Sequence, residues 1–221
     1  MGVRSRIVAV AAAATACLLG FAGPASADLT PEDETEAAIA ETNTWWANHF
    51  SEFFRGSYSP PYVYPGQRTG YPGIYDSGLG EAPVCGGTAL GPMNAFYCWP
   101  DNYVAFDDQL LLQRSTGDAF IYLVVAHEWG HAIQARISPK LVPQWIELQA
   151  DCFAGAEIAG AVRDGLITWE EGDSQEVYNA LVELADKTPW TDSTSHGDPQ
   201  QRIDFFNYGN ANGVLGCLPA R

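Results

Sequence analysis

Basic side chains are scarce in this chain. Lysine and arginine together number 11, against 27 aspartates and glutamates, so the 221 residues carry a formal net charge of −16. A surface of this charge repels the phosphate backbone of nucleic acids and the headgroups of anionic membranes. The composition therefore argues against nucleic acid as a partner and against a charge-driven association with membranes. Its simplest use is to keep the protein soluble.

A long apolar run is also missing, apart from one short stretch near the N-terminus. Arg4 and Arg6 precede an apolar segment at 7–21, and Ala-Ser-Ala at 25–27 has the small residues at which signal peptidase cleaves. The segment is shorter than the roughly 20 residues that a membrane-spanning helix needs. We therefore expect residues 1–27 to form a cleaved signal peptide rather than a membrane anchor.

Cleavage there would leave residues 28–221 as the secreted chain. Its length suits one domain with a substantial core and is too short for two. The net charge becomes −18, because two of the 11 basic residues leave and all 27 acids stay. No stable membrane association is expected after cleavage. A lipoprotein anchored through Cys17 is the weaker alternative, because Ala14 stands where such a signal usually has leucine or valine.

Cysteine is sparse, and its use agrees with export. Of five cysteines, four follow the expected signal peptide, and four cysteines in an oxidising compartment suggest two bridges with three possible connectivities. Cys85 and Cys98 flank a glycine-rich segment, so they are expected to close a local loop. That leaves Cys152 with Cys217. A zinc cluster of cysteines is the alternative, and the lack of any C-x-x-C pair disfavours it.

The pattern of caps, chain breakers and apolar spacing predicts a helix, a long irregular segment, two strands and further helices. Thr30 and Pro31, followed by three acids, begin a helix that runs to about residue 54, with aromatic residues on its buried side: Trp46, Phe50, Phe53 and Phe54. The segment 55–93 is rich in tyrosine, glycine and proline. Strands are expected at 94–98 and 103–106. The remaining helices are expected at 108–114, 118–137, 144–162, 168–187 and 198–208.

This order of elements predicts an α+β fold, in which a small antiparallel or mixed sheet packs against several helices. The helix at 168–187 is expected to begin at a capping box formed by Thr168 and Glu171. The whole of 28–221 is expected to form a single domain.

Histidine is rare as well, and two of the four lie in the motif His-Glu-Trp-Gly-His at 127–131. On the apolar helix expected there, His127 and His131 lie about one turn apart, so both imidazoles project from one face and can share a metal ion. Glu128 lies at the edge of that face, within reach of a water molecule on the metal. The alternative is two unrelated core histidines. His49, on the aromatic helix, is expected to be a packing or surface residue.

A catalytic zinc ion needs a third protein ligand and one open position. Metzincins take this ligand from a histidine six residues after the second, where this chain has Ile137, and they need glycine where it has Gln134. A carboxylate from the next helix is the other source. Glu147 and Asp151 lie one turn apart there, so Glu147 can bind the metal while Asp151 accepts the remaining N–H of a ligating histidine. We therefore predict one Zn²⁺ per chain, held by His127, His131 and Glu147.

Several segments together resemble the bacterial neutral zinc metallopeptidase family, which is gluzincin-like. They are Cys-Gly-Gly, Phe-Tyr-Cys-x-Pro-Asp, His-Glu-Trp-Gly-His-x-x-Gln, Glu-Leu-Gln-Ala-Asp-Cys-Phe-Ala-Gly and His-Gly-x-x-x-Gln-Arg, and they cover roughly residues 85–204. The resemblance implies a zincin-like fold with an HExxH active-site helix. It assigns the role of zinc ligand to His127, His131 and Glu147. It makes Glu128 the general base and Asp151 an outer partner of the ligands. The chain departs from the family at 55–84 and in its short tail.

His196 precedes the last expected helix, in Ser-His-Gly-Asp-Pro-Gln-Gln-Arg at 195–202. Gluzincins place a hydrogen-bond donor downstream of the ligand helix to stabilise the oxyanion, and His196 suits that role. The alternative is a surface histidine that caps the helix. Arg202, one turn into the helix, is expected to pair with Asp151 or another acid.

These features predict a secreted zinc metallopeptidase of the gluzincin type that acts on peptide or protein substrates. Glu128 is expected to take a proton from the attacking water and pass it to the leaving amine. The strand that begins at Asn94 could hold an extended substrate by its free edge, or be ordinary sheet. Two alternatives stay open. One is a zinc hydrolase of a non-peptide amide, such as a cell-wall bond, and the other is a catalytically silent zincin that binds protein partners.

Overall fold

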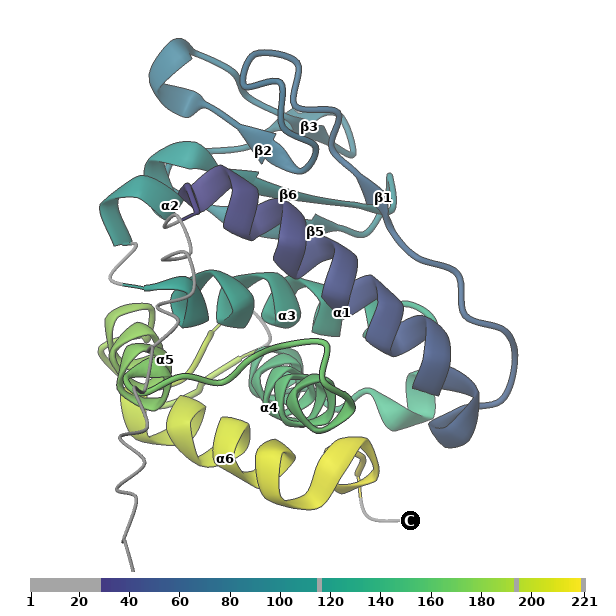
Figure 1. The fold of residues 1–221 in the computed structure, drawn as a ribbon. Coiled ribbons are helices and arrows are strands. Elements are labelled where there is room, and N and C mark those ends of the chain that lie inside the picture. The colour runs from purple at the N-terminus through teal and green to yellow at the C-terminus, as the bar shows by residue number, and fades with distance from the viewer. Residues whose placement is uncertain (1–28, 115–116, 193–194, 220–221) are drawn as a thin grey trace, which may run out of the picture.

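The computed structural model describes residues 29–114, 117–192 and 195–219. The expected signal peptide lies outside these ranges. A small sheet lies over helix α3 (Asp118–Gln134), and two further helices, α4 (Ile146–Asp164) and α6 (Pro199–Gly216), lie on the other side of α3 (Figure 1). The chain is therefore an α+β domain in which α3 is the central buried element.

The first helix, α1 (Pro31–Phe53), begins as predicted. The Thr30 hydroxyl accepts a hydrogen bond from the backbone N–H of Asp33 at 3.2 Å, Pro31 occupies the first helical position, and acids fill the first turn. Its aromatic side packs into the core: Trp45, Trp46, Phe50 and Phe54 are buried, and Phe53 is half-buried. The helix crosses the sheet and α3 on one side of the molecule (Figure 1).

The sheet is built around strand β6 (Tyr103–Asp107). Strand β5 (Ala95–Cys98) pairs with it antiparallel, and β1 (Tyr62–Val63) and β2 (Ile74–Tyr75) pair in parallel with its two halves. The carbonyl of Val104 and the N–H of Phe106 bond to the β1 and β2 side, whereas the N–H of Asp107 bonds to Asn94. Successive backbone groups of a strand face opposite edges. Strand β5 therefore forms the edge opposite β1 and β2.

The prediction that residues 55–93 are irregular throughout is wrong. Besides β1 and β2, this segment contains a 3₁₀ turn at Ser77–Leu79 and a hairpin of β3 (Val84–Cys85) and β4 (Thr88–Ala89). The hairpin turn is Gly86-Gly87, and both residues have positive φ, at 57° and 87°, which favours glycine. Strands of two residues carry no readable alternation, and β1 and β2 exist because they pair with β6 farther along the chain.

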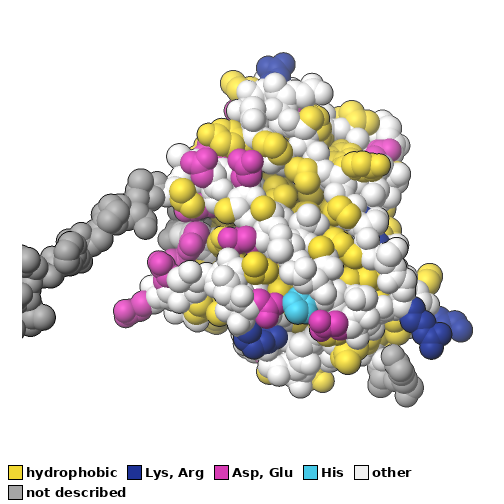
Figure 2. Space-filling view, turned by 45° about the vertical axis from the view of Figure 1, so that its right-hand side comes forward, with side chains coloured by type: hydrophobic (Ala, Val, Ile, Leu, Met, Phe, Trp, Pro, Cys, Tyr) yellow, Lys and Arg dark blue, Asp and Glu magenta, His cyan; other side chains and the backbone are white. Residues whose placement is uncertain are grey.

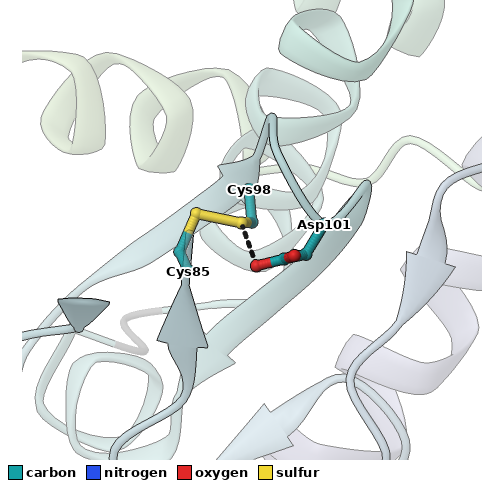
Figure 3. Close-up of side chains that lie close together, drawn as sticks. All are labelled: Cys85, Cys98 and Asp101. Carbon is teal, nitrogen blue, oxygen red and sulfur yellow. Dashed lines mark hydrogen bonds between the residues drawn. A yellow bond between two sulfur atoms is a disulfide. The ribbon is translucent and has the colours of Figure 1, made fainter. Parts of the chain in front are cut away.

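Both predicted disulfides are present, Cys85–Cys98 across 13 residues and Cys152–Cys217 across 65. The first joins the hairpin to the end of β5. There Oδ2 of Asp101 lies 3.5 Å from the Cys98 sulfur (Figure 3). The same oxygen accepts a hydrogen bond from the Gly86 N–H at 2.7 Å. Because all four sulfurs are in bridges, a cysteine zinc cluster is excluded. Two such bridges are characteristic of a chain that folds in an oxidising environment.

The helices after β6 differ from the prediction mainly at their ends. Helix α2 (Asp108–Arg114) matches, and α3 ends three residues early. Helix α5 spans only Asp173–Glu183, so the capping box predicted at Thr168 is wrong. The Asp173 carboxylate instead accepts the N–H of Glu170 at 2.6 Å, ahead of the helix. None of the helices in the described ranges combines the length and apolarity needed to cross a membrane.

Helix α6 begins at the capping box of Asp198 and Gln201 and continues eight residues beyond its predicted end. Gly213, with φ 67° and ψ −176°, interrupts it with a kink. A positive φ of this kind favours glycine. The chain turns there, so Cys217 at the end of α6 reaches Cys152 on α4. A 3₁₀ turn at Pro139–Leu141 occupies part of the connection between α3 and α4.

Candidate metal centre

Helix α3 is buried along nearly its whole length, and it carries the His-Glu-Trp-Gly-His motif. His127, Glu128 and His131 have relative exposures of only 6, 8 and 7%. Apolar neighbours on the same helix, such as Val125 and Ala132, are fully buried. Polar side chains in such a place are stable only when they have partners. The partners of these three side chains therefore define the site.

The structure brings the predicted ligands together. The Nε2 atoms of His127 and His131 lie 3.2 and 3.1 Å from Oε2 of Glu147, which is on the first turn of α4. One nitrogen or oxygen from each of the three residues lies within 4.8 Å of the others. Two imidazoles and one carboxylate are a ligand set that zinc accepts, with a coordination position left open. This cluster could hold a metal ion.

The second nitrogen of His127 faces a buried ion pair. Its Nδ1 lies 2.8 Å from Oδ1 of Asp151, which has no exposed surface. Arg202, on α6, donates two hydrogen bonds, of 2.8 and 2.6 Å, to the same carboxylate. It donates a third, of 2.9 Å, to the carbonyl of Leu184. Burial would raise the pKa of Asp151, but Arg202 and His127 lower it. The prediction that Arg202 pairs with Asp151 is confirmed.

The second nitrogen of His131 faces an amide that the sequence did not single out as functional. Nδ1 lies 2.9 Å from Oε1 of Gln134, one turn further along α3. The Gln134 amide nitrogen donates to the carbonyl of Ile146 at 2.7 Å and to Oε1 of Gln149 at 3.1 Å. The signal was available, because Gln134 follows His131 by three residues and so lies on the same helix face.

These outer partners decide which ring atoms face the centre. Asp151 and the Gln134 oxygen are acceptors, so each Nδ1 carries the donated proton and each Nε2 is directed at Glu147. In a neutral ring Nε2 is also an acceptor, so three acceptor atoms converge. They repel one another unless the rings gain protons or a cation lies among them.

The pKa values of His127 and Glu147 reflect this convergence. Burial lowers the pKa of His127, but Asp151 and Glu147 overcome it and raise the pKa to about 10. Burial raises the pKa of Glu147, but hydrogen bonds to His127 and His131 reverse the shift and lower it. A divalent cation satisfies the same three atoms without extra protons. The donor set therefore fits zinc.

A cavity of about 160 Å³ opens beside Glu128. Its walls come from the chain before and into β5, from α2 and α3, and from the segment around α5 and α6: Met93, Asn94, Ala95, Leu110, Leu123, Val124, His127, Glu128, Leu184, His196 and Arg202. Leu110, Leu123 and Val124 form an apolar part of the lining, and the polar part includes His127, Glu128, His196 and Arg202. The cavity thus has Ala95 of the sheet edge β5 and His127 of the metal cluster in its wall.

His196 lies at the rim of this cavity. It is half-exposed, and its Nε2 is 3.8 Å from Oε2 of Glu147, farther than either ring nitrogen of α3. Its backbone N–H donates to Oδ2 of Asp186 at 2.7 Å, and its Nδ1 is 3.7 Å from the other Asp186 oxygen. Asp198 caps α6, so His196 is not the helix cap. Its position beside the cluster leaves the oxyanion role as a prediction.

The remaining histidine lies elsewhere, as predicted. The His49 ring nitrogens lie 2.7 Å from Asp164 at the end of α4 and 3.1 Å from Glu52 on α1.

Figure 2 shows one face of the molecule, with acidic side chains interspersed among apolar ones and flanking a histidine. The acidic surface expected from the composition is thus visible there.

Comparisons with known proteins identify distant relatives and leave the activity open. The chain is 29% identical over 215 residues to a protein described as uncharacterized protein YpfJ of Escherichia coli strain K12, an alignment that covers 82% of this chain and 70% of YpfJ. The YpfJ protein of Escherichia coli O6:H1 strain CFT073 matches to the same extent. No protein-family model and no solved structure matches the chain.

Proposed function

We propose that this protein is a zinc-dependent metallopeptidase of the gluzincin type, secreted into an oxidising environment. The observation that carries the proposal is the convergence of two Nε2 atoms and one carboxylate oxygen, each within 3.2 Å of a neighbour, beside a buried glutamate. Zinc binding alone requires His127, His131 and Glu147. It does not require Glu128, and a carboxylate at that position favours catalysis over a structural metal.

The chain's own residues divide the chemistry between them. His127, His131 and Glu147 would hold the zinc ion, which supplies the Lewis acidity that acidifies a water molecule and polarises a carbonyl. Asp151 and Gln134 fix the two imidazoles with Nε2 inward. Glu128 lines the cavity and accepts the proton of the attacking water on its carboxylate. It then delivers this proton to the nitrogen of the departing amine.

The cavity supports a peptide substrate in particular. Strand β5 is the sheet edge beside Glu128, and Ala95 lies on the cavity wall. An extended peptide can bond to such an edge through its backbone, which would place a scissile carbonyl over the metal cluster. His196, which also lines the cavity, would donate from Nε2 to the oxygen of that carbonyl as negative charge develops on it.

Peptide cleavage by the purified, zinc-loaded chain tests this proposal. Glu128→Gln keeps the shape of the side chain and removes the base, so we expect cleavage to fall about 10²- to 10⁴-fold with zinc content unchanged. Glu170→Gln, on the exposed connection before α5, is the matched control and should cleave normally. Full activity of Glu128→Gln would refute the mechanism. Cleavage of muropeptides but not of peptides would assign the site to cell-wall amides instead.

A further inference from the structure

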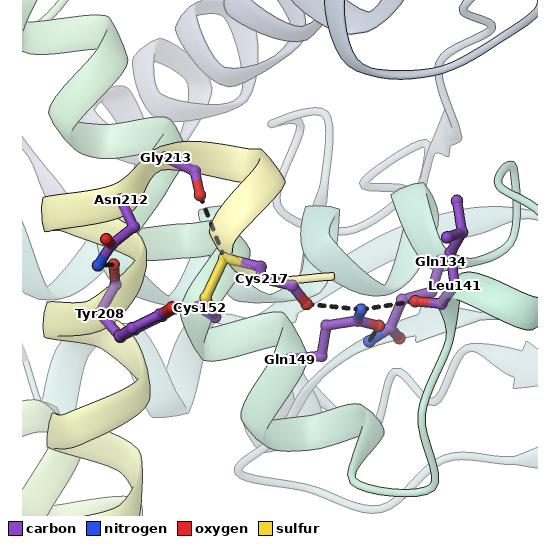
Figure 4. The surroundings of a disulfide bond; sticks show 8 residues. All are labelled: Gln134, Leu141, Gln149, Cys152, Tyr208, Asn212, Gly213 and Cys217. Carbon is purple, nitrogen blue, oxygen red and sulfur yellow. Dashed lines mark hydrogen bonds between the residues drawn. A yellow bond between two sulfur atoms is a disulfide. The ribbon is translucent and has the colours of Figure 1, made fainter. Parts of the chain in front are cut away.

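Two buried glutamines connect the metal cluster to the C-terminal disulfide. Gln134 and Gln149 have relative exposures of 2 and 0%. Starting from Nδ1 of His131, the contacts run to Oε1 of Gln134, from its amide nitrogen to Oε1 of Gln149, and from that amide nitrogen to the carbonyl of Cys217. The last step is 3.0 Å long, and Figure 4 shows it beside the Cys152–Cys217 bridge.

The orientation of both amides is determined by their partners. The Gln149 nitrogen donates to two carbonyls, those of Leu141 at 2.8 Å and Cys217 at 3.0 Å. The Gln134 nitrogen likewise donates to the carbonyl of Ile146 and to the Gln149 oxygen. Turning either amide over would place oxygen against oxygen in a buried site. The hydrogen bonds through the two amides therefore run in one consistent direction. They present the Gln134 oxygen to His131 as an acceptor.

The acceptor at the end of this series of hydrogen bonds is the carbonyl of Cys217, a residue that is held covalently. Cys217 follows the Gly213 kink and is buried, and its bridge to Cys152 ties it to α4. Gln149 lies three residues before Cys152 on the same helix. The bridge thus fixes the distance between the Gln149 side chain and the Cys217 carbonyl.

We propose that Gln134 and Gln149 are positioning residues for the metal ligand His131, and that the Cys152–Cys217 disulfide anchors them, so that loss of this bridge weakens metal binding. The inference rests on the metal centre of the proposed function. An outer partner that fixes ring orientation raises metal affinity because the ligand loses less freedom on binding. In this protein the outer partner of His131 is Gln134, which is itself held by Gln149, and Gln149 is held by the carbonyl of Cys217.

Zinc affinity, measured by competition with a chromogenic chelator, tests the two glutamines without relying on catalysis. Gln134→Met and Gln149→Met keep the side-chain volume, and we expect them to weaken zinc binding about 10- to 100-fold and about tenfold. Gln134→Glu keeps an acceptor for Nδ1 of His131 but loses both donors. It should lower stability and weaken zinc binding less than Gln134→Met does, because a carboxylate is a common outer partner of a ligating histidine. A purely structural role predicts the same zinc affinity for the Met and Glu variants.

The two disulfides provide a matched pair for the anchor. Removing Cys152–Cys217 with two alanines should weaken zinc binding about fivefold, a smaller effect than that of a direct partner. Removing Cys85–Cys98 in the same way should leave it unchanged. Adding Gln149→Met to the Cys152/Cys217 variant should cost less than it costs in the wild type, because both changes break one chain of contacts. Additive losses would overturn the coupling.

The outcomes separate this inference from the proposed function. A wild-type chain that binds no zinc would overturn both. Tight zinc binding by the wild type, with unchanged affinity in Gln134→Met and Gln149→Met, would overturn only the inference. Should the glutamine variants not fold, the disulfide pair decides, and equal zinc affinities of the two disulfide variants would refute the anchor.

Discussion

Helix α4 buries two carboxylates six residues apart, and their surroundings differ. Asp151, at the metal cluster, accepts two hydrogen bonds from Arg202 and one from His127, and these partners lower its pKa. Glu157, on the side of α4 that packs toward α1, is equally buried, and burial raises its pKa to about 8. The charge of Glu41 adds to this shift.

The comparison shows that burial does not by itself decide the charge of a carboxylate. A cation held by good geometry keeps Asp151 ionised, whereas desolvation favours the neutral form of Glu157. Asp151, the carboxylate with charged and hydrogen-bonding partners, lies at the candidate metal centre. Changing Asp151 and changing Glu157 therefore give effects of opposite sign on stability.

The largest expected loss of stability comes from removing the Asp151 carboxylate. Asp151→Ala leaves the Arg202 guanidinium buried without its partner, and it removes the acceptor for Nδ1 of His127. Losing one member of a buried ion pair costs about 3–5 kcal/mol of unfolding free energy. Chemical denaturation measures it, with exposed Asp204→Ala on α6 as the control. A loss below about 1 kcal/mol, the value of a surface pair, would show that Asp151 is not held as described.

A smaller effect is expected at His196, which is only half-buried and has no buried ion pair. If it donates to the oxyanion, His196→Ala should lower kcat about a hundredfold and leave zinc content unchanged. His49→Ala, which alters a histidine outside the site, should change neither. Near-normal turnover of His196→Ala would remove it from the mechanism, and a parallel fall in zinc content would make it a ligand instead.

The change at Glu157 has the opposite sign, because it should stabilise the folded chain. Because the pKa of Glu157 rises from 4.5 to about 8 in the folded chain, the native state holds a proton that the unfolded state releases between these pH values. Its contribution to stability is complete below pH 4.5 and is lost as the pH rises through 8. Glu157→Gln should therefore match the wild type near pH 4 and exceed it by roughly 4 kcal/mol at pH 8.

Denaturation at the two pH values, compared between variant and wild type, isolates this contribution from other titrating groups. Exposed Glu171→Gln is the control, and its stability should follow that of the wild type at both pH values. Equal stability of Glu157→Gln and the wild type at pH 8 would contradict the raised pKa.

The elements that carry the candidate site were predictable because their information is local. His127 and His131, and likewise Glu147 and Asp151, lie one turn apart, so helical periodicity places each pair on one face. That the two faces meet through Nε2 and Oε2 depends on how α3 packs against α4. The sequence offered that step only as an expectation, and the structure brings these atoms together.

The failures have physical causes of two kinds. Strands β1 and β2 are two residues long and are stabilised by β6, about 30 to 40 residues away, so no local pattern reveals them. Local motifs can also lose to packing, since Thr168 and Glu171 form a capping box in sequence but α5 begins at Asp173. Gln149 was missed because a buried amide reveals its role only through its partners.

The central claim is that two histidines of α3 and a glutamate of α4 form a zinc site. Zinc content and chelator-competition affinity of the wild type and of Glu147→Ala test it most directly. The account predicts about one zinc per wild-type chain and an affinity in Glu147→Ala that is weaker by more than about 100-fold, beyond the effect of any outer partner. Full zinc occupancy of Glu147→Ala with unchanged affinity would contradict it.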